Sequence, residues 1–375
     1  MNTSKPPYDF EKIISAFEIE ADPDSLKPFG TGHINDTFYL ANKNPSGKDY
    51  LLQRINHFVF KDIEALTNNI LTVTEHLRKK LGNMSDVENR VLTLLPAKDK
   101  KHFYRDESGN YWRLCYFLND THTYDLVETE QQAFEGGKAF GEFQALLSDL
   151  KPALLTETIP HFHDIEKRLQ QLQDAIKNNK AGRVKEVSAE LDFIGQNTAQ
   201  VLVIPEMARA GKLPKRIIHY DTKFSNVLLD SRDQAQCVID LDTVMPGYVA
   251  SDFGDAMRTL GNTASEDEND LEKIQINLPL FKAYTQGYFS TAGPFLTEPE
   301  VESLVHGVFL LPFMQAVRFL TDYLEGDIYY KTHFAGHNLQ RTKAQLRLFR
   351  QFRENEKALR SIIKEEAGKI LITGK

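Results

Sequence analysis

A single β-hairpin inside a mostly helical stretch limits the possible folds of this chain more than any other feature of the sequence. Two apolar runs, 226–230 and 236–242, flank the turn residues Ser231-Arg232-Asp233-Gln234. Runs of this length around a polar turn are typical of a hairpin. From about residue 119 to 366 the remaining apolar residues recur every three or four positions, which predicts helices. We therefore expect the hairpin to present side chains that the surrounding helices could not bring together.

The polar residues around the hairpin indicate a chemistry. Asp221 lies five residues before Asn226, and Asp240 comes near the end of the returning strand, which carries it back toward Asn226. One aspartate can orient a hydroxyl and accept its proton, while an asparagine and a second aspartate can bind Mg²⁺ against a triphosphate. Lys223 lies two residues after Asp221 and could neutralise phosphate charge. The pattern favours phosphoryl transfer over its plain alternative, a polar turn before a strand.

The first third of the chain predicts a small sheet that carries one helix. Strand patterns at 35–40, 50–55, 91–95, 102–105 and 111–118 suggest the order β-β-α-β-β-β. The helix is marked by one apolar stripe: Ile63, Leu66, Ile70, Val73 and Leu77. A length of 375 residues also fits two units of about 150 residues or more. We expect an α+β fold with a small antiparallel sheet lobe, residues 1–116, and a larger, mainly helical lobe, residues 117–375.

Composition excludes several classes of protein. A hydrophobic share of 41% is too high for a disordered chain. The 53 acidic against 45 basic residues, a net charge of −8, argue against a nucleic-acid-binding surface. Two cysteines make no disulfide framework, and neither a secretory signal nor an apolar run of about 18 residues is found. We expect a cytoplasmic protein with no nucleic-acid or membrane partner; the oligomeric state stays open, a monomer being one option.

The motif His219-x-Asp221-x4-Asn226, followed by Ile239-Asp240, resembles the aminoglycoside phosphotransferase and choline kinase superfamily. The fold of that superfamily is similar to that of protein kinases. Longer strings are similar to the N-acetylhexosamine 1-kinases: Gly30–Thr37, Leu51–Asn56, Val238–Gly247 and Arg318–Asp327. The resemblance implies a two-lobed, protein-kinase-like fold and the transfer of the γ-phosphoryl group of ATP, with Mg²⁺, to the anomeric 1-hydroxyl of a free N-acetylhexosamine of the GlcNAc or GalNAc type. Asp221 would be the base, Lys223 a charge-neutralising residue, and Asn226 and Asp240 the metal ligands.

The resemblance also implies where the nucleotide binds. Gly30-Thr31-Gly32 suits a glycine-rich loop over the ATP phosphates, although on its own it would read as a plain turn. Where a protein kinase carries a strand lysine, this chain offers Arg54, with Gln53 as the alternative if the other face of the strand points to the nucleotide. The helix glutamate that would pair with it is Glu64 or Glu75.

The segment 113–118 is expected to be the hinge that meets the adenine, with Cys115 and Phe117 contributing apolar contacts. Its plain alternative is an ordinary buried strand.

Three residues are candidates for binding the acceptor sugar beside Asp221. His33 follows the glycine-rich loop, and its alternative is a surface histidine. Arg318 lies in an apolar stretch, where an arginine is costly unless it is paired. Its alternative is an ion pair with Asp322 one helical turn on. Tyr329 follows a helix-ending turn and is favoured over Tyr330 for contact with a sugar.

Other interpretations are kept beside this one. Another small-molecule kinase of the superfamily, acting on a different sugar, choline or an aminoglycoside, would share the same catalytic residues. A catalytically inactive binding module is disfavoured because Asp221, Asn226 and Asp240 are all present. His161 and His163 are better explained by polarity at a helix start than by a metal site. Asp252 and Asp255 are expected to brace the catalytic loop from the next helix.

Overall fold

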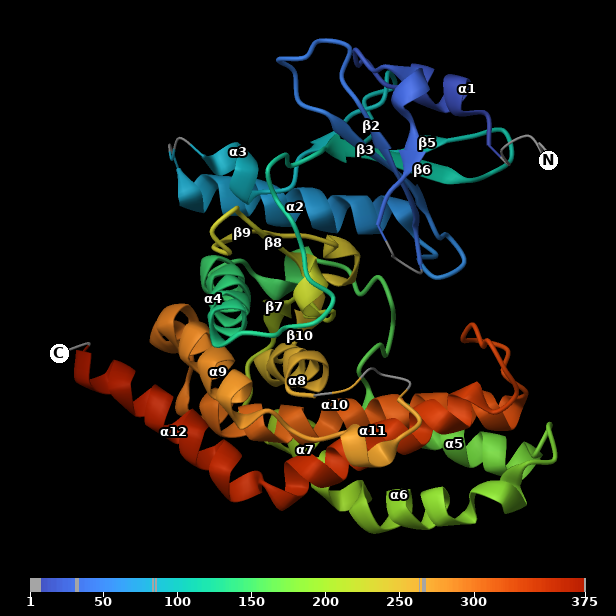
Figure 1. The fold of residues 1–375 in the computed structure, drawn as a ribbon, viewed down its shortest axis with the longest axis vertical. Coiled ribbons are helices and arrows are strands. Elements are labelled where there is room, and N and C mark those ends of the chain that lie inside the picture. Colours follow the sequence, from blue (N-terminus) through green and yellow to red (C-terminus); the bar gives the residue numbers. More distant parts are fainter. Residues whose placement is uncertain are drawn as a thin grey trace.

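The N-terminal part of the chain folds into an antiparallel sheet that lies above a helical lobe (Figure 1). The computed structural model describes residues 8–30, 34–82, 84, 86–262, 264 and 268–373. Its main strand order is β1-β2-β3-β6-β4, and β5 also pairs with β6. The strands are β1 (Lys27–Pro28), β2 (Asp36–Leu40), β3 (Tyr50–Ile55), β4 (Leu94–Leu95), β5 (Tyr104–Arg105) and β6 (Tyr111–Tyr116).

The two faces of this sheet are covered by different helices. The pleat sends alternate side chains to opposite faces, so Leu52 and Trp112 pack with the short helix α1 (Phe10–Ser15) on the outer face. Ile55 and Cys115 pack on the inner face against α2 (Ile63–Leu81). The inner face therefore looks toward the helical lobe.

Helix α2 is the helix predicted from the apolar stripe. Asp62 caps it, with its side chain accepting from the Ala65 backbone N–H at 2.9 Å. The members of the stripe are buried: Ile63, Leu66, Ile70, Val73 and Leu77. They share one core cluster with Phe143 and Val244 of the helical lobe, so α2 packs against both lobes at once.

The predicted strand at 91–95 is wrong in its first half. Only Leu94–Leu95 pairs with β6, while α3 (Val87–Arg90) precedes it. The guanidinium of Arg78 on α2 donates to the carbonyl oxygen of Leu92 at 2.8 Å, so that carbonyl is bonded to a side chain instead of a strand.

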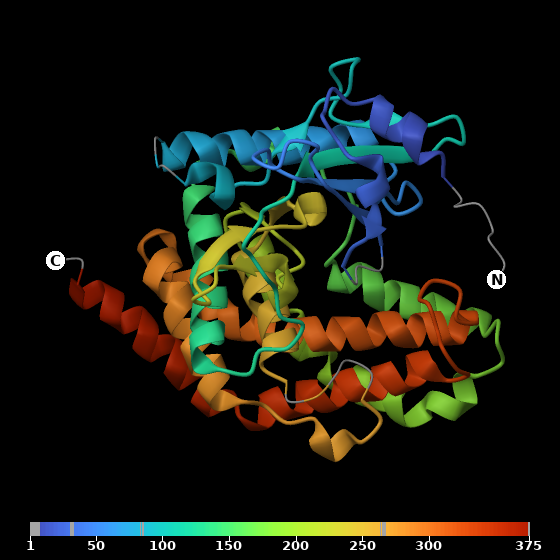
Figure 2. The ribbon, with the colours of Figure 1, turned by 45° about the horizontal axis from the view of Figure 1, so that its top comes forward.

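The helical lobe is built around one long, buried helix. Figure 2 shows α10 running across this lobe, while α4 rises toward α2. Helix α10 is long and apolar enough to span a membrane, yet 78% of its apolar window is buried inside the protein. The helices are α4 (Glu130–Leu146), α5 (Ile165–Asn178), α6 (Ser188–Val201), α7 (Val203–Arg209), α8 (Val249–Leu260), α9 (Leu278–Ala292), α10 (Glu298–Glu325), α11 (His337–Glu354) and α12 (Glu356–Thr373).

The predicted hairpin is present as β8 (Val227–Leu229) paired with β9 (Ala235–Val238). A second short pair, β7 (Arg216–Ile218) with β10 (Met245–Gly247), flanks it in sequence. The C-terminal tail is helical, as the recurrence of apolar residues up to about 366 predicts. It forms α11 and α12, separated at Asn355, and it buries Phe349, Phe352 and Leu359 in the core.

Helices α8 and α10 approach closely because both carry glycine at the contact. A Cβ atom added at Gly307 would lie 1.8 Å from the carbonyl oxygen of Ala250, and one at Gly254 would lie 2.2 Å from that of Gly307. A larger residue at either position would push the helices apart. Helix α8 also contacts β7 and the turn at Phe224–Asn226, so its packing against α10 helps to position these segments.

We expect Gly307→Ala to lower the free energy of unfolding by about 1–3 kcal/mol or more, because the methyl group overlaps a backbone carbonyl. Gly195→Ala on α6 is the control, since a Cβ atom there meets nothing within 4 Å. The control should be neutral or stabilising by up to ~1 kcal/mol. Urea denaturation measures both, and equal midpoints would contradict this packing.

Candidate active site

The catalytic loop, residues 219–226, connects β7 to β8 and is fixed by a buried histidine. His219 lies between the rings of Phe140 and Phe143, at 5.6 and 5.8 Å between centroids. Its Nε2 donates to the carbonyl oxygen of Ile239 at 2.9 Å, which leaves Nδ1 to accept from the Asp221 N–H at 3.3 Å. The histidine thus joins the loop to the end of the hairpin and orients the backbone at Asp221.

Two aspartates of α8 also fix the catalytic loop by accepting hydrogen bonds from its backbone. Asp252 accepts from the backbone N–H groups of His219 and Tyr220 at 2.8 and 2.7 Å. Asp255 accepts from the N–H of Thr222 at 3.0 Å. Both carboxylates are buried, and burial raises the pKa of each. These contacts match the bracing role expected for both residues.

The carboxylate of Asp221 is held by two neighbours. Its Oδ2 accepts from Lys223 Nζ at 2.8 Å and from Asn226 Nδ2 at 3.2 Å. Burial raises the pKa of Asp221, but the Lys223 ammonium and the hydrogen bonds outweigh it, and the net pKa is lowered. The carboxylate is therefore ionised at neutral pH and can accept a hydrogen bond from a hydroxyl group.

Asp240 lies beside this group in a strained backbone conformation. Its φ is +60°, a left-handed conformation that is uncommon outside glycine, and it lies two residues after the end of β9. Its Oδ2 is 3.8 Å from Lys223 Nζ. Burial and the neighbouring Asp242 carboxylate raise the pKa of Asp240 to about 6. The hairpin thus returns Asp240 to the catalytic loop, as its spacing predicted.

The donor set at this point fits a divalent cation. Asn226 donates through Nδ2 to the Asp221 carbonyl oxygen at 2.8 Å, which leaves its Oδ1 without a hydrogen-bond partner in the described part of the chain. Among the same residues no hydrogen bond reaches the Asp240 carboxylate. Amide and carboxylate oxygens are the ligands that Mg²⁺ prefers, alongside substrate phosphates. Among the described residues no group of three or more His, Cys, Asp and Glu forms a metal cluster.

Arg318 has different partners from those the sequence suggested. Its Nη1 donates to the side-chain oxygen of Gln315 at 2.9 Å. Its guanidinium lies over the rings of Phe162 and Tyr330, 5.5 and 5.6 Å from the centroids. Phe162 stacks on His163, and His163 contacts the ring of Tyr220, the neighbour of Asp221. A chain of packed rings therefore joins Arg318 to the catalytic loop.

Asp322, the alternative partner of Arg318, is used elsewhere. Its two carboxylate oxygens accept from the backbone N–H groups of Ile328, Tyr329 and Tyr330 at 2.8–3.0 Å. The ion pair with Arg318 is therefore not formed. Instead Asp322 fixes the loop that follows α10, and Tyr329 on that loop is 67% exposed. His33 lies outside the described residues.

The side chains expected around the nucleotide are divided between the two faces of the sheet. Arg54 lies on the outer face, where its Nε donates to Asp36 Oδ2 at 2.6 Å and its guanidinium lies near the ring of Tyr8. Gln53 lies on the inner face, toward the helical lobe. Glu64 and Glu75 on α2 are both exposed. Arg54 is therefore not paired with a glutamate of this helix.

The remaining nucleotide candidates lie at different places in the sheet lobe. Gly30 has a φ of +76°, whereas Thr31 and Gly32 lie outside the described residues. Cys115 is buried on the inner face, and burial raises the pKa of its thiol to about 11, so it is not a nucleophile at neutral pH. Phe117 is half-buried and meets Phe29 edge-on at 5.2 Å.

Sequence reasoning missed a buried network on the inner face. Arg113 forms an ion pair with Asp242, and Gln53 and Asn35 bond to this pair. All of these residues lie in segments that the sequence already singles out: the strings Gly30–Thr37, Leu51–Asn56 and Val238–Gly247 and the expected hinge 113–118. Their grouping was not predictable because it depends on which face of each strand points inward.

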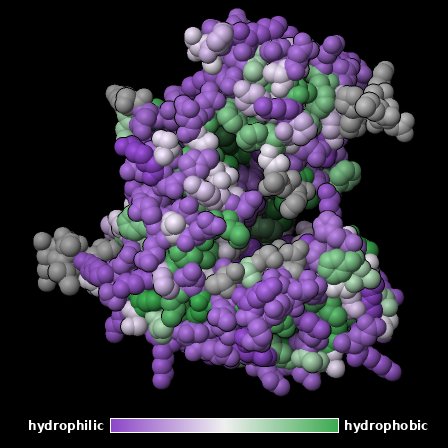
Figure 3. Space-filling view, in the orientation of Figure 1, coloured by the Kyte–Doolittle hydropathy of each residue, from purple (hydrophilic) through white to green (hydrophobic). Residues whose placement is uncertain are grey.

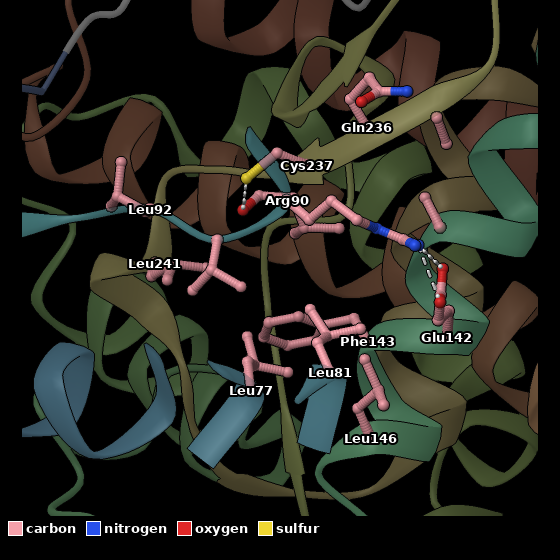
Figure 4. A pocket seen from close by; sticks show the side chains of 14 residues that line it. Leu77, Leu81, Arg90, Leu92, Glu142, Phe143, Leu146, Gln236, Cys237 and Leu241 are labelled. Atoms are coloured by element: carbon pink, nitrogen blue, oxygen red, sulfur yellow. Dashed lines mark hydrogen bonds and ion pairs between the residues drawn. The ribbon is translucent and has the colours of Figure 1, made fainter. Parts of the chain in front are cut away.

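Two hollows accompany the site. The space-filling view shows a recess between the lobes with apolar side chains in its floor (Figure 3). A separate cavity of about 40 Å³ lies between α2, α4 and β9, lined by Leu77, Phe143 and Cys237 among others (Figure 4). Arg90 and Glu142 bridge its rim, with Arg90 Nη2 at 3.0 and 3.1 Å from the carboxylate oxygens. It contains none of the candidate catalytic residues.

A small antiparallel sheet lobe, a larger helical lobe and an Asp-Lys-Asn loop facing a hairpin aspartate define a phosphotransferase with a protein-kinase-like fold. The chain belongs to the phosphotransferase enzyme family APH, whose model matches residues 25–289. This confirms the superfamily predicted from the His219–Asn226 motif. The finer resemblance to N-acetylhexosamine 1-kinases stays a prediction.

The same fold is found in solved structures of other proteins. The chain is similar to an aminoglycoside phosphotransferase from Alicyclobacillus acidocaldarius, with 11% identity, a TM-score of 0.60 and 98% of each chain covered. An ethanolamine kinase from Plasmodium vivax matches with 15% identity and a TM-score of 0.53, over 88% of this chain and 85% of that one. An amicoumacin kinase bound to AMP-PNP and Ca²⁺ matches with 11% identity and a TM-score of 0.61, over 91% and 93%. At these identities the likeness establishes the fold, and it confirms the predicted two-lobed α+β architecture.

Proposed function

We propose that this protein is a kinase that uses ATP and Mg²⁺ to phosphorylate the anomeric hydroxyl of a free N-acetylhexosamine. The observation that carries the phosphoryl-transfer part is the convergence of Asp221, Lys223, Asn226 and Asp240 at the end of the hairpin. The sugar part is supported by the four sequence strings and by an arginine held between aromatic rings beside the catalytic loop.

In the proposed reaction Asp221 accepts a hydrogen bond from the 1-hydroxyl. The hydroxyl oxygen attacks the γ-phosphorus of ATP, the bond from that phosphorus to the bridging oxygen breaks to release ADP, and Asp221 takes the hydroxyl proton late in this step. Lys223 neutralises charge on the transferred group, and it is already oriented toward both aspartates. Asn226 and Asp240 would hold Mg²⁺, which when bound supplies charge neutralisation to the phosphates. No covalent enzyme intermediate is needed, so rate comes from alignment and electrostatics.

The nucleotide would lie between the sheet and the hairpin. Gly30-Thr31-Gly32 would cover its phosphates, and the hinge with Cys115 and Phe117 would contact the adenine. Arg54 is a poor phosphate ligand in this arrangement because it faces the outer side of the sheet. The inner-face position beside it belongs to Gln53.

The acceptor sugar would lie beside Asp221 and contact Arg318 and Tyr329. His33, next to the glycine-rich loop, would contact it from the sheet lobe. Arg318 suits this role because its bonded partner, Gln315, is neutral. A guanidinium has five donors, so it retains several for sugar oxygens. The stacking on Phe162 and Tyr330 fixes its plane in advance.

We expect Arg318→Ala to raise the KM for the sugar by about 10- to 150-fold, because the variant loses charge-assisted hydrogen bonds worth about 1.5–3 kcal/mol. The KM for ATP should change little. Arg350→Ala is the control, because Arg350 also lies over an aromatic ring, that of Phe193, but on α11 away from the loop. Steady-state kinetics with varied sugar check this, and an unchanged sugar KM in a folded variant would refute the assignment.

A panel of acceptors tests the proposed function. ADP formation with Mg²⁺–ATP would be compared for N-acetylglucosamine, N-acetylgalactosamine, glucose, galactose, choline and an aminoglycoside. The proposal predicts the highest kcat/KM for one of the two N-acetylhexosamines. A preference for choline, an aminoglycoside or an unsubstituted sugar would contradict the acceptor class, and no turnover with any acceptor would favour a binding module.

A further inference from the structure

We propose that Arg113 and Asp242 form the ion pair that couples the sheet lobe to the metal-binding loop of this enzyme. By metal-binding loop we mean the segment 240–242, which contains the proposed metal ligand Asp240. In protein kinases a strand lysine paired with a helix glutamate must be in place for activity. Here the pair is made instead by an arginine of β6 and an aspartate two residues beyond Asp240. The inference rests on the proposed kinase function and concerns how that site is assembled.

The geometry of the pair is that of a bidentate, buried salt bridge. Arg113 Nη2 donates to Asp242 Oδ2 at 3.1 Å, and its Nη1 donates to Oδ1. Arg113 is 4% exposed and Asp242 is 2% exposed. Since a charge of either sign is costly to bury alone, each of these residues depends on the other.

The pair is tied into the sheet by neutral partners. Gln53 lies opposite Arg113 in the β3–β6 register, accepts from Arg113 Nε at 2.9 Å and donates to Thr37 Oγ1 at 3.0 Å. Asn35 donates to Asp242 Oδ2 at 2.7 Å, and its own Oδ1 accepts from the Asn56 N–H at 3.0 Å. Strands β2, β3 and β6 therefore all converge on Asp242.

Through Asp242, these contacts with the strands also restrain the metal-binding loop. One residue separates it from Asp240, and the intervening Leu241 is buried in the core cluster that contains α2. The carbonyl oxygen of Asp242 also accepts a hydrogen bond from Thr158 Oγ1 at 3.2 Å. Asp240 itself accepts no hydrogen bond in the described part of the chain, so its position is set by its neighbours.

Helix α2 is not available for this task. Its glutamates Glu64 and Glu75 are exposed, and Arg54 lies on the opposite face of the sheet. Asn69 fastens α2 directly to the other lobe: its Nδ2 donates to the carbonyl oxygens of Thr156 and Val244 at 2.8 and 3.2 Å, and its Oδ1 accepts from the Thr156 N–H at 3.0 Å. Lys80 of α2 also pairs with Asp149 of the helical lobe, with Nζ 2.6 Å from Oδ2. None of these polar contacts of α2 reaches Asp240, whereas the Arg113–Asp242 pair lies two residues from it along the chain.

The test replaces both members of the pair at once. A single substitution would leave a buried charge unpaired and endanger folding, whereas apolar replacement of both partners is often neutral for stability. The test protein is therefore the full chain carrying Arg113→Met and Asp242→Leu. The control is Arg90→Met with Glu142→Leu, which removes another Arg–carboxylate pair between the lobes. It joins α3 to α4 at the rim of the separate cavity, with Arg90 Nη2 within reach of both carboxylate oxygens.

We expect the test variant to stay folded by circular dichroism, with kcat lowered at least 10²-fold. The Mg²⁺ concentration for half-maximal turnover should rise at least 10-fold, with the sugar KM unchanged. The control pair should leave all three values within about 3-fold of wild type. A folded test variant with wild-type kcat and Mg²⁺ dependence would overturn the inference, as would a control pair with an equal loss.

A second readout separates this inference from the proposed function. Binding of the non-hydrolysable analogue AMP-PNP is titrated with and without Mg²⁺. The test variant should lose at least 10-fold in affinity with Mg²⁺ and little without it, whichever acceptor the enzyme uses. Equal Mg²⁺-dependent affinity in wild type and variant would overturn the inference, whereas failure of the wild type to phosphorylate any sugar would contradict the proposed function alone.

Discussion

Replacement of Asp221 by asparagine is expected to lower kcat by about 10²- to 10⁴-fold, the usual effect of losing a positioned general base. Asparagine keeps the size of the side chain, but its amide cannot take the proton of the acceptor hydroxyl. The carboxylate that it replaces is ionised and oriented by Lys223 and Asn226. The KM for ATP should stay close to wild type, because Asp221 is proposed to contact the acceptor.

The matched control is Asp174→Asn, an exposed aspartate on α5. It should leave kcat unchanged, which excludes a general effect of removing one negative charge. Turnover would be measured as ADP release at saturating ATP and acceptor. If Asp221→Asn kept near wild-type kcat, the assignment of the base would be wrong.

The second large effect concerns the proposed metal ligands. Asp240→Asn should lower kcat/KM for Mg²⁺–ATP by about 10²-fold or more, because a neutral amide holds the cation and its phosphates less well. Asn226→Ala should act in the same direction, and EDTA should abolish turnover in the wild type. Part of the loss in Asp240→Asn should be recovered at high Mg²⁺.

The measurement for this second prediction is turnover as a function of free Mg²⁺ at fixed ATP. Asp230→Asn beside the hairpin turn is the control, since within the described residues the Asp230 carboxylate bonds only to the turn backbone and Arg232. An Asp240→Asn enzyme with unchanged Mg²⁺ dependence would contradict the assignment of Asp240.

The local parts of this fold and site were predictable because neighbouring residues specify them. The stripe from Ile63 to Leu77 marks one face of a helix, and the structure buries that face. The interval from Asp221 to Asn226 and the hairpin length together fix where Asp240 returns. These features follow from periodicity and turn chemistry, which act over a few residues.

The features that the sequence could not decide depend on contacts between distant segments. Gln53 and Arg54 alternate across a strand, and only the packing of α1 and α2 decides which faces inward. Arg318 and Asp322 are one helical turn apart, but the loop after α10 supplies three backbone donors that Asp322 satisfies instead. The Arg113–Asp242 pair joins residues 129 apart in sequence, so no local pattern could reveal it.

The position of the transferred phosphate tests the central proposal most directly. The wild-type protein would be incubated with Mg²⁺–ATP and the better N-acetylhexosamine, and the product examined by phosphorus and carbon NMR. The proposal predicts a phosphate on C1, and no transfer to the methyl glycoside of the same sugar, which lacks a free anomeric hydroxyl. A phosphate on any other carbon, or equal turnover with the methyl glycoside, would contradict it.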